Sequence, residues 1–193
     1  MTTTPRILAF AGSTREQSFN KQLVRVAAAA ARAAGGDVTL LDLRDIPMPL
    51  YDGDLEQREG LPANARRFKE LLLAHQGLII ASPEYNSSIS GVLKNAIDWA
   101  SRGLPDEPPL ACFSGKVAAI MSASIGGLGG LRGLVHVRAI LGNINVLVLP
   151  EQIAISNAQE AFTPDGALKE PRQQATVERI AQKLVNVVSR LAQ

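Results

Sequence analysis

The sequence predicts an α/β protein in which helices cover both faces of one parallel sheet. Short runs rich in Val, Ile, Leu and Ala alternate along the chain with longer segments whose apolar residues recur at helical spacing. This alternation of strand and helix occurs five times, the pattern of a parallel sheet with crossover helices. The 193 residues suffice for one ample core and scarcely for two, so we expect a single domain over residues 1–193.

Five apolar runs are the expected strands. They span residues 6–12, 37–43, 77–82, 116–123 and 145–149. With five strands, the expected order across the sheet is 2-1-3-4-5, which is a flavodoxin-like three-layer sandwich. In this arrangement a ligand crevice lies beyond the carboxyl ends of the strands, bordered by the loops that follow the first, third and fourth strands.

The segments between the strands have helical spacing. The first carries on one face the residues Leu23, Val24, Ala27, Ala28, Ala31 and Ala34. Gly35-Gly36 ends this helix, as glycine commonly does. Further helices are expected over residues 63–75, 90–102 and 128–141, and residues 44–62 form a polar, proline-rich connection. A last helix has an apolar stripe made of Val177, Ile180, Ala181, Leu184, Val188 and Leu191.

Charge and composition argue against several classes of protein. The 20 basic residues are interleaved with 18 acidic ones, so no basic patch indicates nucleic-acid binding. The single cysteine, Cys112, excludes an internal disulfide and any multi-cysteine metal site, and we interpret it as an apolar filler. His75 and His136 lie outside any ligand-spaced motif, so both are interpreted as packing or surface residues. No run approaches the ~18 apolar residues of a membrane span and the start lacks a signal-peptide pattern, so we expect a cytoplasmic protein.

The first of the three loops, residues 12–20, has the composition of a phosphate site. It joins a strand to a helix, where backbone N–H groups and the helix dipole favour an anion. Its short polar and charged side chains include Ser13, Arg15, Ser18 and Asn20. Arg15 offers a guanidinium fork suited to phosphate oxygens, and Ser18 is also suited to cap the helix. Capping alone explains Ser18 but not the other three residues.

This loop lacks the two common nucleotide-binding patterns. No Gly-Lys-Ser/Thr sequence follows it, and Gly12 is the only glycine before Gly35. A single phosphate held by hydroxyls and an arginine indicates a mononucleotide such as FMN.

The loop after the third strand contains Pro83, Glu84, Tyr85 and Asn86. Pro83 ends the strand because its ring fixes φ and removes the N–H. A planar heterocycle needs hydrogen-bonding groups along its edge and a flat group against its face. Backbone groups of residues 84–86 with the Asn86 amide suit the edge, and Tyr85 suits the face. A helix start capped by Ser88 or Ser90 explains the same residues, so this stretch alone leaves both interpretations open.

The loop after the fourth strand, residues 122–130, has four glycines in five residues, which lets backbone amides approach a ligand closely. A G-x-G-x-x-G pattern that starts at Gly127 fails because its sixth position is Arg132. We therefore interpret the N–H groups of this loop as donors near the pyrimidine end of a flavin, where they stabilise negative charge.

Four segments carry a family resemblance when they are taken in order. They read GSTREQSFNKQL, MPLYDGDLE, SPEYNSSISGVLKNAIDW and SASIGGLGGLR. Together they resemble the NAD(P)H-dependent FMN reductase family, which includes bacterial quinone, chromate and azo reductases. The similarity spans about residues 6–150.

The resemblance implies a flavodoxin-like fold that binds FMN non-covalently. At the FMN phosphate it places Ser13, Arg15, Ser18 and Asn20. Along the ribityl chain and the ring it places Pro83, Glu84, Tyr85 and Asn86. Along the far edge of the ring it places Ser122, Ser124, Gly126 and Gly127. Ser87 and Ser90 stand where the family often has Gly and Pro.

The resemblance also implies a homodimer or homotetramer formed through the helix after the third strand. Trp99 lies beside the apolar stripe of that helix, and two interpretations stay open: it closes the edge of the core, or it meets a partner subunit. The spacing of Lys94 and Asp98 predicts a salt bridge within the helix.

These features lead us to expect an oxidoreductase. NAD(P)H passes a hydride to bound FMN, and a small-molecule acceptor such as a quinone, chromate, an azo compound or free flavin then takes the electrons. No side-chain acid or base is required, so none is assigned a catalytic role. Tyr51, in the connection over residues 44–62, either flanks the substrate mouth or belongs to a surface connection.

Two other classes of protein are alternatives. A flavodoxin-type electron carrier would bind FMN without reducing small molecules, but such carriers are usually strongly acidic, whereas this chain has a pI of about 8.9 and carries Arg15 in the first loop. A regulatory or binding protein that has kept the fold is the third class. No site for the 2′-phosphate of NADPH is recognisable in the sequence. Both NADH and NADPH therefore stay open as donors.

Overall fold

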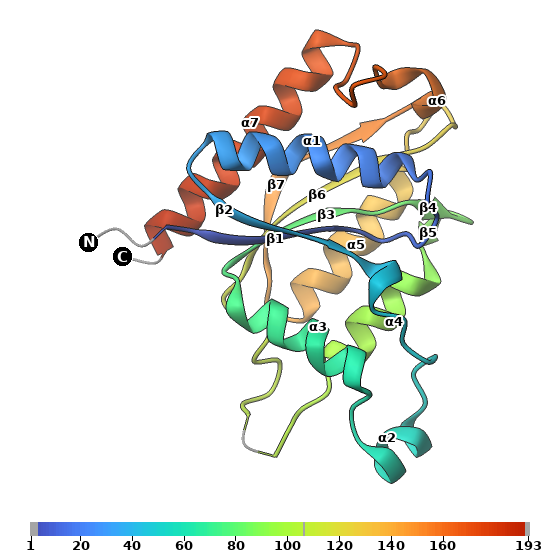
Figure 1. Ribbon diagram of the computed structural model, residues 1–193, viewed down its shortest axis with the longest axis vertical. Helices are drawn as coiled ribbons and strands as arrows, with labels where there is room; N and C mark the ends of the chain where they lie inside the picture. The colour runs from blue at the N-terminus through green and yellow to red at the C-terminus, as the bar shows by residue number, and fades with distance from the viewer. Residues whose placement is uncertain (1–3, 106, 192–193) are drawn as a thin grey trace.

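The computed structural model describes residues 4–105 and 107–191 and has the predicted layers (Figure 1). Five strands pair in parallel in the order β2-β1-β3-β6-β7, which is 2-1-3-4-5 when the strands of this sheet are numbered along the chain. Their bounds are β1 Arg6–Ala11, β2 Asp37–Asp42, β3 Gly77–Ala81, β6 Val117–Ala123 and β7 Leu147–Ile155. The predicted fold class and strand order are confirmed.

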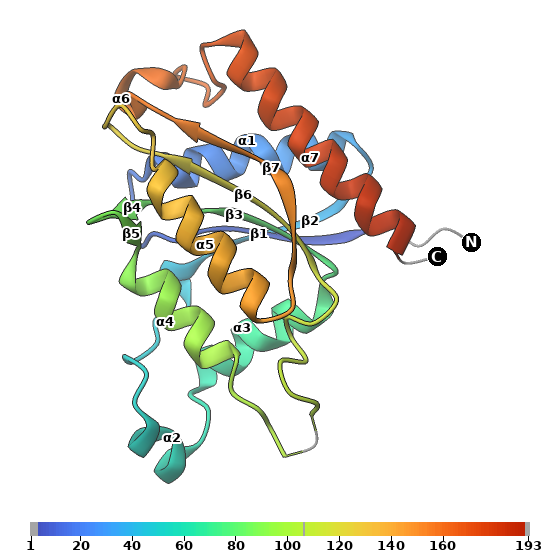
Figure 2. The ribbon, with the colours of Figure 1, turned by 180° about the vertical axis from the view of Figure 1, so that it is seen from behind.

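Helices cover both faces of the sheet, as Figures 1 and 2 show from opposite sides. One face is covered by α1 (Phe19–Ala33) and α7 (Pro171–Leu191), and the other by α3 (Ala63–Ala74), α4 (Gly91–Ala100) and α5 (Leu131–Asn143). In β1, Ile7 and Ala9 belong to the first core, whereas Leu8 and Phe10 belong to the second. Because its side chains are buried on both faces, such a strand is a continuous apolar run.

The first helix ends as predicted. Gly35 has a φ of +92°, and the N–H of Gly36 donates to the carbonyl of Ala31 at 2.9 Å. A left-handed residue followed by a backward hydrogen bond is the usual glycine stop of a helix.

The fifth strand of the sheet, β7, is longer than predicted. The prediction ended it at Leu149, because Pro150 and two polar residues follow. Pro150 has no N–H to donate to a sheet, and the register slips there, so that Ala118 pairs with Val148 but Ile120 pairs with Gln152. The strand therefore bulges at the proline and continues beyond it.

The helix α5 begins three residues later than predicted. Gly129 and Gly130, which precede it, have φ values of +61° and +92°, in the left-handed region that a right-handed helix excludes. The prediction missed this boundary because the apolar spacing starts at Leu128.

Several short elements were not predicted. They are β4 (Glu84–Tyr85), β5 (Ser88–Ile89), a 3₁₀ turn (Leu43–Asp45), α2 (Gly53–Glu59) and α6 (Ala158–Ala161). Within the connection over residues 44–62, the Asp52 carboxylate caps α2 by accepting from the N–H of Asp54 at 2.9 Å. α2 buries no residue and projects away from the sheet (Figure 1).

The connection is fastened to α4 through its tryptophan. Trp99 is fully buried, its Nε1 donates to the carbonyl of Pro49 at 2.8 Å, and the ring of Tyr51 meets it edge-on at 5.0 Å. Trp99 thus closes the edge of the core, and the interpretation that it meets a partner subunit is wrong. The predicted Lys94–Asp98 salt bridge is present at 2.7 Å.

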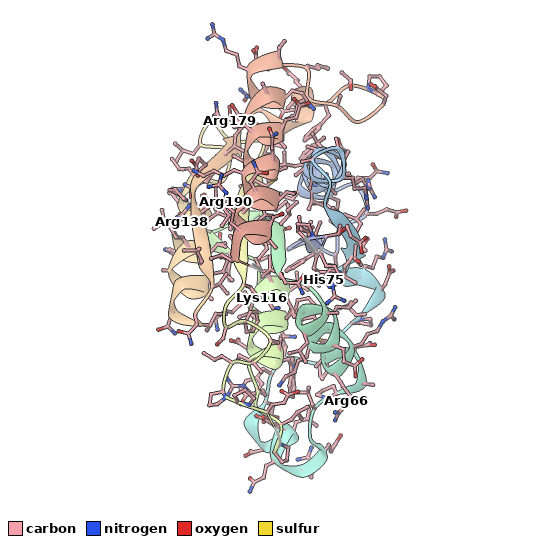
Figure 3. All side chains as sticks on the ribbon, turned by 90° about the vertical axis from the view of Figure 1, so that its left-hand side faces the viewer. Arg66, His75, Lys116, Arg138, Arg179 and Arg190 are labelled. Carbon is pink, nitrogen blue, oxygen red and sulfur yellow. The ribbon has the colours of Figure 1, made fainter. Side chains whose placement is uncertain are left out.

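The amino ends of the strands carry structural polar groups (Figure 3). Lys116 Nζ donates to the backbone carbonyl of His75 at 2.5 Å, and His75 Nε2 lies 2.8 Å from Thr39 Oγ1. Cys112 is fully buried, and this burial raises the pKa of its thiol to about 11. His75 and Cys112 are therefore packing residues, as predicted. Across the described ranges, no helix combines the length and the apolar character needed to cross a membrane.

Candidate functional site

The carboxyl ends of β1, β3 and β6 bring three loops together at one edge of the sheet. The N–H of Gly12 donates to the carbonyl of Ala81 at 2.9 Å, and the N–H of Ser82 donates to the carbonyl of Met121 at 2.8 Å. The sheet ladder thus continues into the start of each loop. The three segments that the sequence selected lie next to one another for this reason.

A hollow of about 360 Å³, here called the loop hollow, lies between the first two of these segments. It is lined by residues 12–15 of the first loop, by Tyr85, and by residues 90–92 at the start of α4. Its volume is within the range of small-molecule sites. A larger groove of about 860 Å³ lies along the outer side of α1 and contains no residue of the β3 or β6 loops. Of these two, the loop hollow is the better candidate because it contains the predicted residues Ser13, Arg15 and Tyr85, whereas the groove contains no predicted site residue.

The polar side chains of the first loop differ in their exposure to solvent. Ser13 and Ser18 are buried, whereas Arg15 is exposed and lies over the ring of Phe19, with Cζ at 5.3 Å from the ring centre. Ser18 occupies the N-cap position of α1 in an extended conformation, but its hydroxyl makes no capping bond in the described part of the chain. Ser18 therefore occupies the expected N-cap position, but its side chain does not make the expected capping hydrogen bond.

Asn20 connects the first loop to the third. It is buried, its Nδ2 donates to the carbonyl of Ala123 at 2.8 Å, and its Oδ1 accepts from the N–H of Ala123 at 3.0 Å. The two residues lie 103 positions apart, so no local sequence pattern indicates this pair. The amide oxygen and one amide N–H of Asn20 are thus committed to holding the end of β6.

Ser90 connects the second loop to the first. Its Oγ accepts from the N–H of Leu93 at 3.2 Å and donates to the carbonyl of Gly12 at 2.5 Å. Ser90 is therefore the serine that caps α4, and the alternative cap, Ser88, bonds to His136 instead, at 2.8 Å from its Nδ1.

The second loop is a β-hairpin. β4 and β5 pair in antiparallel fashion across a two-residue turn, in which Asn86 and Ser87 have φ values of +51° and +65°. Tight hairpins of two residues favour positive φ at both positions, which asparagine tolerates well. Pro83 is buried behind the hairpin, and Tyr85 is 54% exposed. Tyr85 thus stands half exposed at the rim of the loop hollow.

The carboxylate of Glu84 faces α5. Its Oε1 lies 2.6 Å from Arg132 Nη2, and its Oε2 accepts from the N–H of Gly133 at 3.0 Å. Burial would raise the pKa of Glu84, but the Gly133 N–H and the Arg132 guanidinium outweigh it and hold the pKa below its ordinary value. The sequence interpretation used only the backbone of Glu84 and did not find Arg132 or Gly133.

The glycine loop after β6 has two parts. A Cβ on Gly126 or Gly127 would meet almost nothing, so the backbone there is open to approach. A Cβ on Gly129 would lie 2.7 Å from the backbone of Ile155, and one on Gly130 would lie 1.9 Å from Ser122 Oγ. The backbone of the first pair of glycines is therefore open on its Cα side, and the second pair is required by packing.

The two serines of this loop also differ. Ser122 is fully buried beneath Gly130, and among the described residues its Oγ has no hydrogen-bond partner. Ser124 Oγ accepts from the N–H of Gly126 at 3.3 Å. Ser124 thus holds the open part of the loop through a hydrogen bond, whereas Ser122 packs against Gly130 in the buried part.

A second hollow, of about 250 Å³, adjoins the loop hollow and shares Thr14 and Val92 with it. Its other walls come from residues 43–48 and from Asn95 and Ala96 of α4. Tyr51 lines neither hollow. Its N–H donates to Asn95 Oδ1, and its hydroxyl donates to Glu56 Oε2. The start of the connection, rather than Tyr51, borders the site.

Comparison with known proteins identifies this constellation of loops. The model of a family described as NADPH-dependent FMN reductase matches residues 5–160. The chain belongs to this family. An NAD(P)H-dependent FMN reductase of Pseudomonas aeruginosa is 38% identical over 187 residues, which cover 96% of each chain. A quinone reductase of Escherichia coli is 40% identical over 144 residues, 75% of this chain and 73% of that one.

A solved structure has the same fold as this FMN reductase. It is FerB, a flavoenzyme NAD(P)H:(acceptor) oxidoreductase from Paracoccus denitrificans, with a TM-score of 0.81 and 24% identity over 97% of this chain and 98% of that one. Family membership makes the protein an NAD(P)H-dependent oxidoreductase with FMN as cofactor, as the sequence predicted.

Proposed function

We propose that FMN binds in the loop hollow and that the enzyme passes electrons from NAD(P)H to quinones. The convergence of Ser13, Arg15 and Tyr85 on one hollow at the carboxyl ends of β1 and β3 carries the proposed location. The quinone acceptor is supported by the Escherichia coli relative, whose name states this activity.

The residues of the first loop fit a phosphate monoester. The first turn of α1 contains no acidic side chain, and the Ser18 hydroxyl is not used in capping, so the N–H groups of that turn are available to an anion. Ser13 and Ser18 supply hydroxyls, and Arg15 supplies a charge-assisted donor. We assign Ser13, Arg15 and Ser18 to binding of the FMN phosphate. We assign Asn20 to the phosphate end of FMN as well, as a donor through its second amide N–H.

The other two loops fit a flat ring. Tyr85 offers an exposed aromatic face beside the turn at Asn86, and the backbone of Pro83 and Glu84 runs along the rim. On the opposite side, Ser124, Gly126 and Gly127 present an open stretch of backbone. We assign these residues to the ribityl chain and the ring, with Ser122 in support.

When bound, FMN supplies the redox chemistry by accepting a hydride from NAD(P)H and delivering electrons to the acceptor. The chain binds and orients the reactants. The exposed backbone of Gly126 and Gly127, and the N–H of Gly127 in particular, is suited to stabilise negative charge at the far edge of the ring. Because this chemistry requires no side-chain acid or base, we assign no proton donor.

The proposal extends to the setting of the enzyme. Chromate, azo compounds and free flavin are proposed as further acceptors, because each can take electrons at an open flavin face. We also propose a cytoplasmic homodimer or homotetramer assembled through α4, which borders both hollows. A sedimentation experiment that finds only monomers would contradict the proposed assembly.

A pair of arginine variants tests the cofactor site. Replacing Arg15 with alanine should weaken FMN binding about 10- to 100-fold, because hydrogen bonds to charged groups contribute about 1.5–3 kcal/mol. Arg25→Ala removes an exposed arginine from α1, outside the loop hollow, and should leave the Kd unchanged. Flavin fluorescence quenching measures both values.

The activity is tested on the same preparations. The wild-type protein should oxidise NAD(P)H when a quinone is present, whereas an electron carrier would bind FMN and show almost no such turnover. Protein that takes up no added FMN would contradict the proposed function. Equal FMN affinity in the Arg15→Ala variant would contradict only the phosphate assignment.

A further inference from the structure

The helix α5 is capped by a residue from outside its own segment. Its N-cap is Gly130, which has no side chain to offer, and its first turn contains no acidic residue. Glu84, on β4, accepts a hydrogen bond from the N–H of Gly133, the third residue of the helix. A carboxylate at this place satisfies an otherwise unpaired N–H and complements the helix dipole.

Two glycines allow the hairpin to lie directly on the helix. A Cβ added to Gly133 would lie 3.3 Å from Glu84 Cβ and 3.3 Å from the backbone oxygen of Ser88. A Cβ on Gly130 would also lie 3.6 Å from Glu84 Cβ. The hairpin therefore packs closely against the backbone of α5 at these two glycines.

Two further contacts hold the same surfaces together. Arg132 Nε donates to Glu84 Oε1 at 2.8 Å, and His136 Nδ1 lies 2.8 Å from Ser88 Oγ. Both strands of the hairpin are thus bonded to the first two turns of α5. The turn between these strands holds Asn86 and Ser87 at positive φ, which is costly for serine and needs support from its surroundings.

We propose that α5 positions the hairpin, and through it Tyr85 and Asn86, for the electron-transfer reaction. Glu84 and Gly133 are positioning residues in this proposal, because they affect the reaction only by setting the position of the hairpin turn. The proposal deepens the proposed function and rests on it. Small displacements of groups that orient a reactant have large effects, about 100-fold in rate for 1 Å.

Two glycines of the same helix provide a matched test. Gly133→Ala requires the hairpin to move by a few tenths of an ångström, whereas Gly142→Ala places its methyl group in open space. Neither glycine has a positive φ, so alanine should favour the helix at both positions by up to about 1 kcal/mol. A purely structural role for Gly133 would therefore give two variants with similar kinetics.

The measurement is stopped-flow reduction of the FMN-loaded proteins by NAD(P)H. We expect the limiting rate of Gly133→Ala to fall about threefold to tenfold while its melting temperature stays within a few degrees of wild type. Gly142→Ala should reduce its flavin at the wild-type rate. A wild-type rate in folded Gly133→Ala would overturn the inference.

A second variant covers the case in which Gly133→Ala does not fold. Glu84→Gln keeps an oxygen for the Gly133 N–H but loses the ion pair with Arg132, and it should lower the limiting rate about twofold to fivefold. An unchanged rate in this variant would also overturn the inference. Wild-type protein that is not reduced by NAD(P)H would instead overturn the proposed function, and the inference with it.

Discussion

At the scale of single residues, neighbouring polar groups of the site have different roles that follow from their surroundings. Ser90 caps a helix, Ser122 is sealed beneath Gly130, and Ser124 bonds within its own loop. The composition of the loops predicted a polar crevice, but it did not distinguish these serines. Composition did not predict the role of Glu84 either, whose carboxylate accepts a hydrogen bond from the first turn of α5.

The stability of the protein should depend on the ionised form of Glu84. Its pKa in the folded protein is held below the ordinary 4.5, so the stabilisation is present above that pH and is lost as the pH falls through the folded pKa. Glu84→Gln should therefore lower the free energy of unfolding by about 1–2 kcal/mol at pH 7, and by less below pH 4.5. Urea unfolding at pH 7 and pH 3.5 measures both differences.

An exposed glutamate is the control for this pH dependence. Glu16 pairs with Arg44 at 3.5 Å, and both side chains are largely exposed, so Glu16→Gln should change the free energy of unfolding by less than about 0.5 kcal/mol. A Glu84→Gln difference that stays constant across this pH range would show that the carboxylate charge is not stabilising.

At the scale of elements, the helices α4 and α1 begin with different capping. α4 is capped by Ser90, whereas α1 has an uncommitted hydroxyl at Ser18. A capped helix start is structural, and an uncapped one leaves its N–H groups available to a ligand. The starts of α4 and α1 therefore have different roles, and of the two it is the start of α4 that lines the loop hollow.

Two serine variants separate these roles. Ser90→Ala should lower the free energy of unfolding by about 1–2 kcal/mol, because it removes a cap and the bond to the Gly12 carbonyl. Ser18→Ala should leave the stability of the FMN-free protein within about 0.5 kcal/mol and weaken FMN binding. Chemical unfolding and FMN titration of both variants measure this. Equal losses of stability would contradict the distinction.

At the scale of the whole molecule, the proposed cofactor site is built on the central sheet. Its three loops extend from the central strands β1, β3 and β6, and they are tied to one another by Asn20 and Ser90. Unfolding the sheet therefore dismantles the site, so binding of FMN should stabilise the entire fold.

This coupling predicts a stability gain on FMN binding. At a free FMN concentration of 100 times the Kd, the free energy of unfolding should rise by about 2.7 kcal/mol, which corresponds to a melting temperature about 5–10 °C higher. Riboflavin, which lacks the phosphate, should raise it less. In Arg15→Ala the difference between the two ligands should shrink. Calorimetry with each ligand measures these shifts, and equal shifts in wild type would contradict the phosphate site.

The sequence by itself determined the layers, the strand order and the three loops that meet at the crevice. These follow from local patterns, since apolar periodicity and glycine stops act within a few residues. The tertiary structure alone decided which side chains of those loops remain open to a ligand. Asn20 and Ala123 lie 103 positions apart, and Glu84 and Gly133 lie 49 apart, so no local pattern records their hydrogen bonds. Hydrogen bonding commits the side-chain groups of Asn20 and Glu84 to the fold, and only the contacts across the sheet show this.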